Sequence, residues 1–475
     1  MKTRDELTNY LENCNLGTGF RELEEYVINK NNCILCGACV SLCPRIQMED
    51  STPVLLEYDS ECSMCFRYCA RTFFPTIDIK NRIFTGNEKK DLSLGMYRSS
   101  VSAKCNSEEI LEKSQNGGIA TTLLIHALEC NYIDGALLID RDENWKPIPV
   151  VARTPEEIME CAGTKYAISP SLITYEQAVN KYNLKKLAFV GMPCQILAVR
   201  KLQMFPPLSD VYGRFRLIIG LFCSSNFSYD SLKEFVESKF HISISDVKKF
   251  DISKGKFIIY LKDDSIHKID IKELKSLRWS SCINCKDYTA EFADISLGNV
   301  GSDDDNFTSV LIRTEPGESL FNDAIAKQKI IVSENIGLSK IKKLSNNKKT
   351  RISKLNNLSL ESMKAFGLTE KELRVYVSLI MLGNANYSKL EDITKSADDN
   401  LKVLLKKLTD RRWIQKTNGN YSPVNPHKVF RNEISLLRKK LESQIKKIES
   451  ETLKELEELY IKNNFTSFNE KDFLD

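Results

Sequence analysis

Short apolar runs alternate with helical periodicity between residues 95 and 340 of the chain. The pattern predicts helices and strands in alternation: helices over 119–130 and 195–203, and strands over 135–140, 188–191 and 217–222. Two further apolar runs, 256–261 and 265–271, flank three charged residues and are typical of a β-hairpin. Alternating helices and strands indicate an α/β fold, and the hairpin indicates a sheet that is mixed rather than purely parallel.

A polar stretch rich in lysine and asparagine, 340–357, separates this region from a different pattern and is interpreted as a linker. Beyond it the periodicity predicts three short helices, over 368–382, 390–396 and 401–411. Two strands, 413–416 and 421–423, follow around an Asn-Gly turn. Three helices and a two-stranded wing are typical of a winged-helix domain.

A strongly charged helix follows the wing. Its apolar residues recur at spacings of three and four, at Ile434, Leu437, Leu441, Ile445 and Ile448. Such a stripe is either a coiled-coil seam or a face that packs on a core. The register slips near Thr452, which favours a short dimerising helix. A helix folded back on its own domain fits the same pattern, and both interpretations stay open.

Cysteine is the residue type that changes this picture most. The chain has 15 cysteines in 475 residues. The run Cys33, Cys36, Cys39 and Cys43, followed by proline, has the C-x2-C-x2-C-x3-C-P spacing that binds 4Fe-4S clusters. Zinc is the alternative, but zinc thiolates usually come as two separated C-x2-C pairs.

A second run, Cys62, Cys65 and Cys69, has Asp59 where the first cysteine of the motif would stand. Two-cluster ferredoxins exchange their fourth cysteines, which would give Cys33, Cys36, Cys39 and Cys69 to one cluster. The other site then has Cys43, Cys62, Cys65 and either Asp59 as a weaker ligand or no fourth ligand. In the latter case Asp59 is a solvated turn residue and the site holds three irons or none.

The rest of the composition limits which class of protein this chain can belong to. No run of about 18 apolar residues exists, and the first residues are charged, so we expect a soluble, cytoplasmic protein without a membrane segment. A reducing compartment also keeps thiols free for metal clusters. The net charge of +4 does not by itself indicate a nucleic-acid-binding protein, although lysines are concentrated after residue 340.

Two groups of residues in the middle region are candidate ligand-binding sites. The segment Ser114, Gln115, Asn116, Gly117 and Gly118 precedes a predicted helix, as in phosphate-binding loops, although a plain helix N-cap has the same letters. Four cysteines at the ends of apolar strands and in a C-x2-C pair could bind another cubane, a zinc ion or nothing: Cys194, Cys223, Cys282 and Cys285. No residue is predicted to be catalytic.

The order of these motifs, with the Ala-Asp-Ile-Ser-Leu-Gly segment at 293–298, resembles the beta-subunit family of coenzyme F420 hydrogenases and dehydrogenases over residues 30–345. The family includes subunits that reduce this deazaflavin, and the chain is also similar to 7-hydroxymethyl chlorophyll a reductase. The resemblance implies FAD and two or three 4Fe-4S clusters, one of them on Cys194, Cys223, Cys282 and Cys285. It implies that residues 114–118 line the FAD.

A further segment, Gly163 to Tyr166, is similar to the Gly-Ser-Lys-Tyr stretch of the family. Lys165 would then place a positive charge near the flavin, with Tyr166 beside it, unless Lys165 is an ordinary surface lysine. The family implies electron transfer between coenzyme F420 or a ferredoxin-like donor and an acceptor, with a partner oxidoreductase subunit. A subunit that transfers electrons without catalysis of its own is an alternative.

A segment of about the last 110 residues resembles the winged-helix domain of archaeal TrmB-like sugar regulators. Its recognition helix would begin with Asp398, Asp399 and Asn400, and carboxylates there would repel DNA phosphates. Five basic residues could offset them: Lys402, Lys406, Lys407, Arg411 and Arg412. DNA binding, dimerisation and partner docking all stay open, and a redox-sensing transcription regulator is the competing function.

The predicted fold class is therefore multidomain α/β. Its parts are a ferredoxin-like iron–sulfur module over 1–90, with a short helix at 6–14, a flavin-binding core over 91–345, a linker over 346–360, a winged helix over 361–426, and a long helix with a tail over 427–475.

Overall fold

The computed structural model describes residues 19–58, 62, 64–72, 74, 76–204, 213–302, 304, 306–350, 363, 366–382, 385–394, 398–417 and 419–463. The chain divides into two compact units, Met1–Asn356 and Asn357–Asp475, which are described separately. Among the described residues, no helix combines the length and apolarity needed to cross a membrane.

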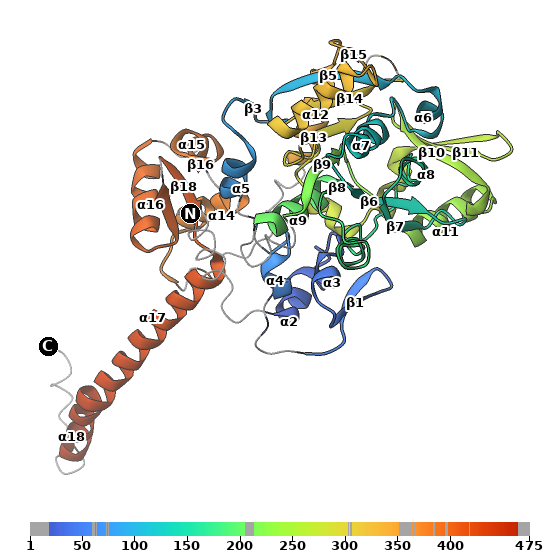
Figure 1. Ribbon diagram of the computed structural model, residues 1–475. Helices are drawn as coiled ribbons and strands as arrows, with labels where there is room; N and C mark the ends of the chain where they lie inside the picture. The colour runs from blue at the N-terminus through green and yellow to red at the C-terminus, as the bar shows by residue number, and fades with distance from the viewer. Residues whose placement is uncertain are drawn as a thin grey trace. The chain divides into compact units, whose positions relative to one another are not determined.

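An eight-stranded sheet forms the centre of the first unit, in the order β15-β5-β14-β13-β9-β8-β6-β7 (Figure 1). The strands are β5 (Ser99–Cys105), β6 (Gly135–Arg141), β7 (Pro147–Ala152), β8 (Leu187–Gly191), β9 (Phe215–Leu221), β13 (Ile295–Gly298), β14 (Thr308–Ile312) and β15 (Ile330–Ser333). Strands β13, β9, β8 and β6 are parallel, whereas the outer strands pair antiparallel. The mixed α/β fold is therefore confirmed.

Helices cover both faces of this sheet because its strands have apolar side chains on both sides. The helices of the core are α6 (Glu108–Lys113), α7 (Ile119–Glu129), α8 (Pro155–Glu160), α9 (Pro193–Met204), α11 (Tyr229–Phe240), α12 (Glu315–Ala326) and α13 (Leu338–Thr350). Leu137 of β6 belongs to one buried cluster with α9, and its neighbour Leu138 belongs to another with α7 and α12. Successive strand residues point to opposite faces, so α9 lies on one face and α7 and α12 on the other.

The predicted hairpin exists, but it is not part of this sheet. Strands β11 (Lys256–Leu261) and β12 (Ile266–Asp270) pair with β10 (Val247–Ser253) in a separate three-stranded sheet. Phe250 and Phe257 stack in a buried cluster of their own, with ring centroids 5.2 Å apart. The main sheet is mixed, as predicted, but this hairpin is not the reason. The apolar face of the hairpin packs within a small subdomain instead.

The cysteine-rich module is built from short elements. These are α2 (Phe20–Leu23), η1 (Glu24–Ile28), α3 (Ala38–Leu42), β1 (Ile46–Glu49), β2 (Thr52–Leu55), α4 (Met64–Tyr68) and α5 (Thr76–Ile83), followed by the hairpin β3 (Lys89–Asp91) and β4 (Gly95–Tyr97). Ile34, Tyr68 and Ile79 share a buried cluster with α9, so the module packs on that face of the main sheet. The predicted helix at 6–14 and Asp59 lie outside the described residues.

The predicted linker was wrong over its first part. Residues up to Thr350 form α13, whose Ile341, Ser345 and Lys348 are buried against the core. The helix was not predicted because two of these three buried residues are polar. Their polar atoms are paired inside the protein, which permits their burial.

The second unit contains α14 (Glu370–Leu382), β16 (Ala385–Asn386), α15 (Tyr387–Thr394), α16 (Asp398–Asp410), β17 (Ile414–Thr417) and β18 (Asn420–Pro423). The three predicted helices and two strands are present, and β16 adds a third strand in the order β16-β18-β17. Trp413 is fully buried between Tyr376 and Phe430.

A long helical segment ends the described chain: α17 (Pro426–Lys447), the π-helical turn η8 (Ile448–Thr452) and α18 (Leu453–Asn463). The predicted apolar stripe is exposed on it, with Leu441 58% and Ile448 55% exposed. The folded-back alternative requires the stripe to pack on the core of its own unit. The exposed side chains contradict that alternative.

Candidate functional site

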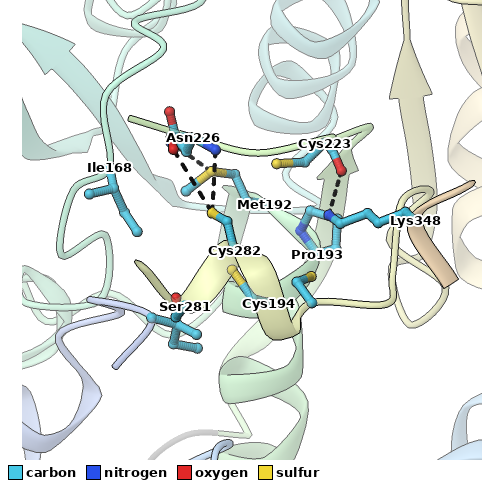
Figure 2. A pocket seen from close by; sticks show the side chains of 11 residues that line it. Ile168, Met192, Pro193, Cys194, Cys223, Asn226, Ser281, Cys282 and Lys348 are labelled. Carbon is cyan, nitrogen blue, oxygen red and sulfur yellow. Dashed lines mark hydrogen bonds between the residues drawn. The ribbon is translucent and has the colours of Figure 1, made fainter. Parts of the chain in front are cut away.

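Four cysteines of the core meet at one edge of the main sheet. Cys194 is in the first turn of α9, directly after β8, and Cys223 lies two residues after β9. Because β8 and β9 are neighbouring parallel strands, their carboxyl ends meet at this edge. Cys282 and Cys285 lie in and just after the short helix η5 (Ser280–Asn284). All four line one pocket (Figure 2).

The residues that line this pocket are compatible with a metal-binding site. Met192, Asn226 and Lys348 also line it. Figure 2 shows the sulfur atoms of Cys194, Cys223 and Cys282 facing the same space. The backbone N–H of Asn226 donates to the sulfur of Cys282 at 3.4 Å. The structure thus brings together the four thiols that the sequence predicted as one ligand set.

Burial keeps the thiols of the pocket protonated in the absence of a metal. Burial raises the pKa of Cys223 to about 12. The pKa of Cys194 is raised well above its ordinary value by burial and by the neighbouring thiols of Cys285, Cys223 and Cys282. Four neighbouring, partly buried thiolates become stable together only when a cationic centre compensates their charge. The set suits both a 4Fe-4S cluster and zinc.

Lys348 is the main charged side chain of this pocket, and no sequence motif indicated it. It comes from α13, is 2% exposed, and donates from Nζ to the carbonyl oxygen of Cys223 at 2.5 Å. Burial alone would lower its pKa, but the thiols of Cys223, Cys285 and Cys194 and the Asp287 carboxylate outweigh burial and raise it. Lys348 therefore stays charged beside the four cysteines.

The amino-terminal cysteines that the structure describes lie in two groups. In the first set, burial is the main cause that raises the pKa of Cys36, and the neighbouring thiols of Cys69 and Cys33 raise it further. The pKa of Cys39 is raised by burial and then by Cys36, Cys33 and Cys69. Cys33, Cys36, Cys39 and Cys69 therefore lie together, as the exchanged fourth cysteine predicted.

The second set is less complete within the described residues. Burial raises the pKa of Cys65 to about 12, and the thiols of Cys62 and Cys43 add to the shift. Cys62 is exposed. Because the structure does not describe Asp59, both interpretations of that residue stay open.

Three backbone contacts join the first amino-terminal set to the core. Lys201 of α9 is 1% exposed and donates from Nζ to the carbonyl oxygen of Cys69 at 2.6 Å. The backbone N–H of Leu172 donates to the carbonyl oxygen of Cys36 at 2.8 Å. The indole Nε1 of Trp279 donates to the carbonyl oxygen of Cys33 at 2.7 Å.

Trp279 also connects this set with the core cysteines. Its own carbonyl oxygen accepts a hydrogen bond from the backbone N–H of Cys282 at 3.0 Å. A single residue therefore contacts one cysteine of each set, and Ile34, next to Cys33, lines the core pocket. The two thiol sets are thus neighbours.

The predicted phosphate-binding segment begins helix α7. Gly118 is the N-cap of α7 with φ +69°, a conformation that favours glycine. A side chain at Gly117 would come 2.6 Å from the carbonyl oxygen of Ala103. No side chain caps α7, so an ordinary side-chain N-cap does not explain the motif. Ser114 is 7% exposed, and its hydroxyl has no hydrogen-bond partner among the described residues.

Gln115 ties this segment to the other residues predicted near a flavin. Its Nε2 donates to Asp251 Oδ1 at 2.7 Å, and its Oε1 accepts from the backbone N–H of Thr164 at 3.4 Å. Burial and then the Asp251 carboxylate raise the pKa of Tyr166 above its ordinary value. The segments 114–118 and 163–166 therefore lie together beside β10. Asn116 belongs to the same segment.

Lys165 is not a surface lysine, so that alternative was wrong. It is 7% exposed, and its Nζ donates to the carbonyl oxygens of Cys161, Ala162 and Gly163 at 2.6, 3.0 and 3.1 Å. These carbonyls belong to Cys161, the C-cap of α8, and to the two residues that follow it. Burial lowers the pKa of Lys165 to about 8.

In the second unit, part of the predicted basic surface is used internally. Lys407 pairs with Glu372 at 2.6 Å, and Arg411 pairs with Glu433 at 2.7 Å. Lys402, Lys406 and Arg412 are exposed. Asp398, Asp399 and Asn400 begin α16, as predicted.

Comparison with known proteins gives three family models. Residues 100–174 and 184–336 match the N-terminal and C-terminal models of the coenzyme F420 hydrogenase/dehydrogenase beta subunit, and residues 26–45 match a 4Fe-4S binding domain.

Characterised relatives agree with these models. The chain is 39% identical to coenzyme F420 hydrogenase subunit beta of Methanosarcina barkeri, over 59% of this chain and 97% of that protein. It is 36% identical to the coenzyme F420-dependent sulfite reductase of Methanocaldococcus jannaschii, over 69% of this chain and 50% of the relative. It is similar to a chain of the solved F420-reducing [NiFe] hydrogenase complex from Methanosarcina barkeri, with a TM-score of 0.54 and 38% identity over 59% of this chain and 97% of that one.

Proposed function

Because the chain belongs to the coenzyme F420 hydrogenase/dehydrogenase beta-subunit family, we propose that it is an iron–sulfur flavoprotein oxidoreductase that moves electrons between coenzyme F420, or a ferredoxin-like donor, and an acceptor. The observation that carries this proposal is Trp279, which contacts both Cys33 and Cys282 and so joins two sets of four thiols. Neighbouring cubane sites are what a relay of single electrons requires.

Each thiol set has a proposed ligand role. Cys194, Cys223, Cys282 and Cys285 would hold one 4Fe-4S cluster, and Cys33, Cys36, Cys39 and Cys69 a second. Cys43, Cys62 and Cys65 would hold a third iron–sulfur site, with Asp59 as the candidate fourth ligand. The match of residues 26–45 to a 4Fe-4S binding domain supports iron over zinc for the amino-terminal sets.

The segment at the start of α7 fits the pyrophosphate of FAD. The buried Ser114 hydroxyl has no hydrogen-bond partner among the described residues and is available to a ligand there. A helix N-terminus also favours negative charge. Gln115 holds this segment against the loop containing Lys165 and Tyr166, which would orient the flavin. FAD, when bound, would supply the exchange between two-electron and one-electron transfer that this function needs.

Three of the protein's own side chains then have two tasks. Lys348 and Lys201 keep positive charge beside the two thiol sets, and Trp279 holds those sets in fixed relation. No general base is required for these tasks. The relative in the hydrogenase complex supports a partner oxidoreductase subunit for this chain as well.

The test is anaerobic purification of the full chain, with iron, sulfide and flavin quantified, followed by addition of reduced coenzyme F420. We expect bound flavin, eight or more irons if both four-thiol sets are loaded at about four each, and prompt bleaching of the visible absorption. A protein that contains flavin and iron but does not react with reduced coenzyme F420 would refute the deazaflavin donor and favour a ferredoxin. A protein that binds neither group would refute the proposal.

The second unit gives the competing function its specific support. Three helices and a three-stranded sheet match the predicted winged-helix order, and the family models end at residue 336, before this unit begins. A redox-sensing regulator would use it to bind DNA. Gel-shift assays of the oxidised and reduced protein test this function, and binding that is absent in both states would refute it. Lys407 and Arg411 pair with acidic side chains of the same unit, whereas Lys402, Lys406 and Arg412 are exposed and available to DNA.

A further inference from the structure

The long helical segment at the end of the second unit has an apolar stripe without a partner among the described residues. The side chains of the stripe, with their exposed fractions, are Ile434 (42%), Leu437 (39%), Leu441 (58%), Ile445 (45%), Ile448 (55%), Leu453 (47%), Leu456 (57%) and Tyr460 (72%). Eight large apolar side chains in one row, each more than a third exposed, are a surface that water disfavours.

The π turn η8 keeps both halves of this row on one face. Five residues of an α-helix turn about 500°, which would place Leu453 about 140° away from Ile448. Instead the backbone N–H of Leu453 donates to the carbonyl oxygen of Ile448, the i to i+5 bond of a π turn. This bond brings Leu453 back above Ile448. The register slip seen in the sequence near Thr452 is therefore compensated, and the stripe runs from Ile434 to Tyr460.

The charges of the segment are divided between its two halves. Between residues 428 and 447 there are seven lysines and arginines and two glutamates. Between 448 and 463 there are five glutamates and two lysines. A parallel pair of these helices would place the basic half beside the basic half of the other copy, whereas an antiparallel pair would place each basic half beside an acidic one.

We propose that the segment α17–η8–α18 pairs with the same segment of a second copy in an antiparallel coiled coil. With the two-fold axis between Lys446 and Lys447, Leu441 lies opposite the partner's Leu453 and Leu437 opposite the partner's Leu456. Ile445 lies opposite the partner's Ile448. The stripe is self-complementary about this axis, as a symmetric dimer requires.

The same register places Arg438 beside the partner's Glu457. Both residues flank the stripe on the same side, where an antiparallel pair brings equivalent flanks together. The pair occurs twice in a symmetric dimer. The proposal concerns the second unit alone and does not depend on the proposed electron-transfer function.

The first experiment is sedimentation equilibrium of the anaerobically purified full chain and two matched variants. Leu441→Glu places a charge in the stripe, and we expect the dimer dissociation constant to rise roughly 100-fold. Leu436→Glu is the control, because Leu436 is also exposed, at 61%, but lies on the opposite side of the helix. A monomeric wild type, or equal effects of the two variants, would overturn the proposal, including the case where another segment of the same chain covers the stripe.

The second experiment tests the orientation. Arg438→Glu and Glu457→Arg each create two like-charge contacts in the antiparallel dimer, and we expect each to weaken it roughly tenfold. The double variant restores opposite charges and should return to within about threefold of the wild type. A dimer that both single changes weaken and the double change does not rescue would overturn the antiparallel arrangement.

Discussion

Replacing Lys348 by methionine should lower the reduction potential of the 4Fe-4S cluster that we propose for the core cysteines. The change removes the buried positive charge beside Cys194, Cys223 and Cys285 and keeps an unbranched side chain of similar volume. Reduction adds negative charge to a cluster, so a nearby cation stabilises the reduced state more than the oxidised state. Without that cation the cluster becomes harder to reduce.

The magnitude follows from the position of the ammonium group. Its Nζ lies 2.5 Å from the carbonyl oxygen of Cys223 and faces the pocket, so its charge acts over a short range. At a separation of roughly 6–8 Å and an effective dielectric constant of about 20, one unit charge contributes about 2–3 kcal/mol. For a one-electron couple this corresponds to a shift of roughly 90–120 mV, which solvent at the pocket opening reduces to about 50–100 mV.

The assay is a redox titration of the full protein, followed by electron paramagnetic resonance, with iron content measured on the same samples. Lys348→Arg keeps the charge and should shift the potential by less than about 30 mV. Lys343→Met is the matched control, because Lys343 is exposed on the same helix. If Lys348→Met retains its iron and its potential moves upward, or moves no more than in Lys343→Met, the reasoning is wrong.

Three further predictions rest on separate contacts. Cys285→Ser should lower the iron content by about four per chain while leaving the amino-terminal clusters, which elemental analysis would detect. Asp294→Asn should cost about 3 kcal/mol in the free energy of unfolding, seen in thermal denaturation, because Asp294 pairs with the buried Arg200 at 2.7 Å. Lys165 binds fewer protons in the folded protein between pH 8 and 10.5, since burial lowers its pKa from 10.5 to about 8. Stability in denaturant should therefore rise with pH across this window, by up to about 3 kcal/mol, and Lys165→Met should remove that rise.

The sequence predicted best what short-range spacing determines. The run from Cys33 to Cys39 is one tight turn that leads into a helix, so its spacing alone brings three thiols of one set together. Cys194 and Cys223 were predicted to meet because each follows an apolar strand, and parallel neighbouring strands end at one edge. The helices and strands of the second unit were also found, since their apolar periodicity is regular.

Long-range polar contacts could not be predicted in this way. Lys348 lies 125 residues from Cys223, and its helix has the composition of a linker because much of what it buries is polar. Arg200 and Asp294 lie 94 residues apart, and neither stands in a motif that indicates a buried ion pair. Lys201 and Trp279 were missed for the same reason: each contacts the backbone of a cysteine, and backbone acceptors have no sequence signature.

The two buried lysines suggest a common principle for the thiol sets. Lys201 and Lys348 come from different helices, yet each donates to the carbonyl oxygen of a cysteine, Cys69 in one set and Cys223 in the other. Burying an ammonium group is unfavourable unless negative charge lies close by, and four thiols become anionic when they bind metal. Each lysine is therefore best compensated when its set is loaded. Because α13 reaches the core through Lys348, cluster binding and the packing of that helix should stabilise one another.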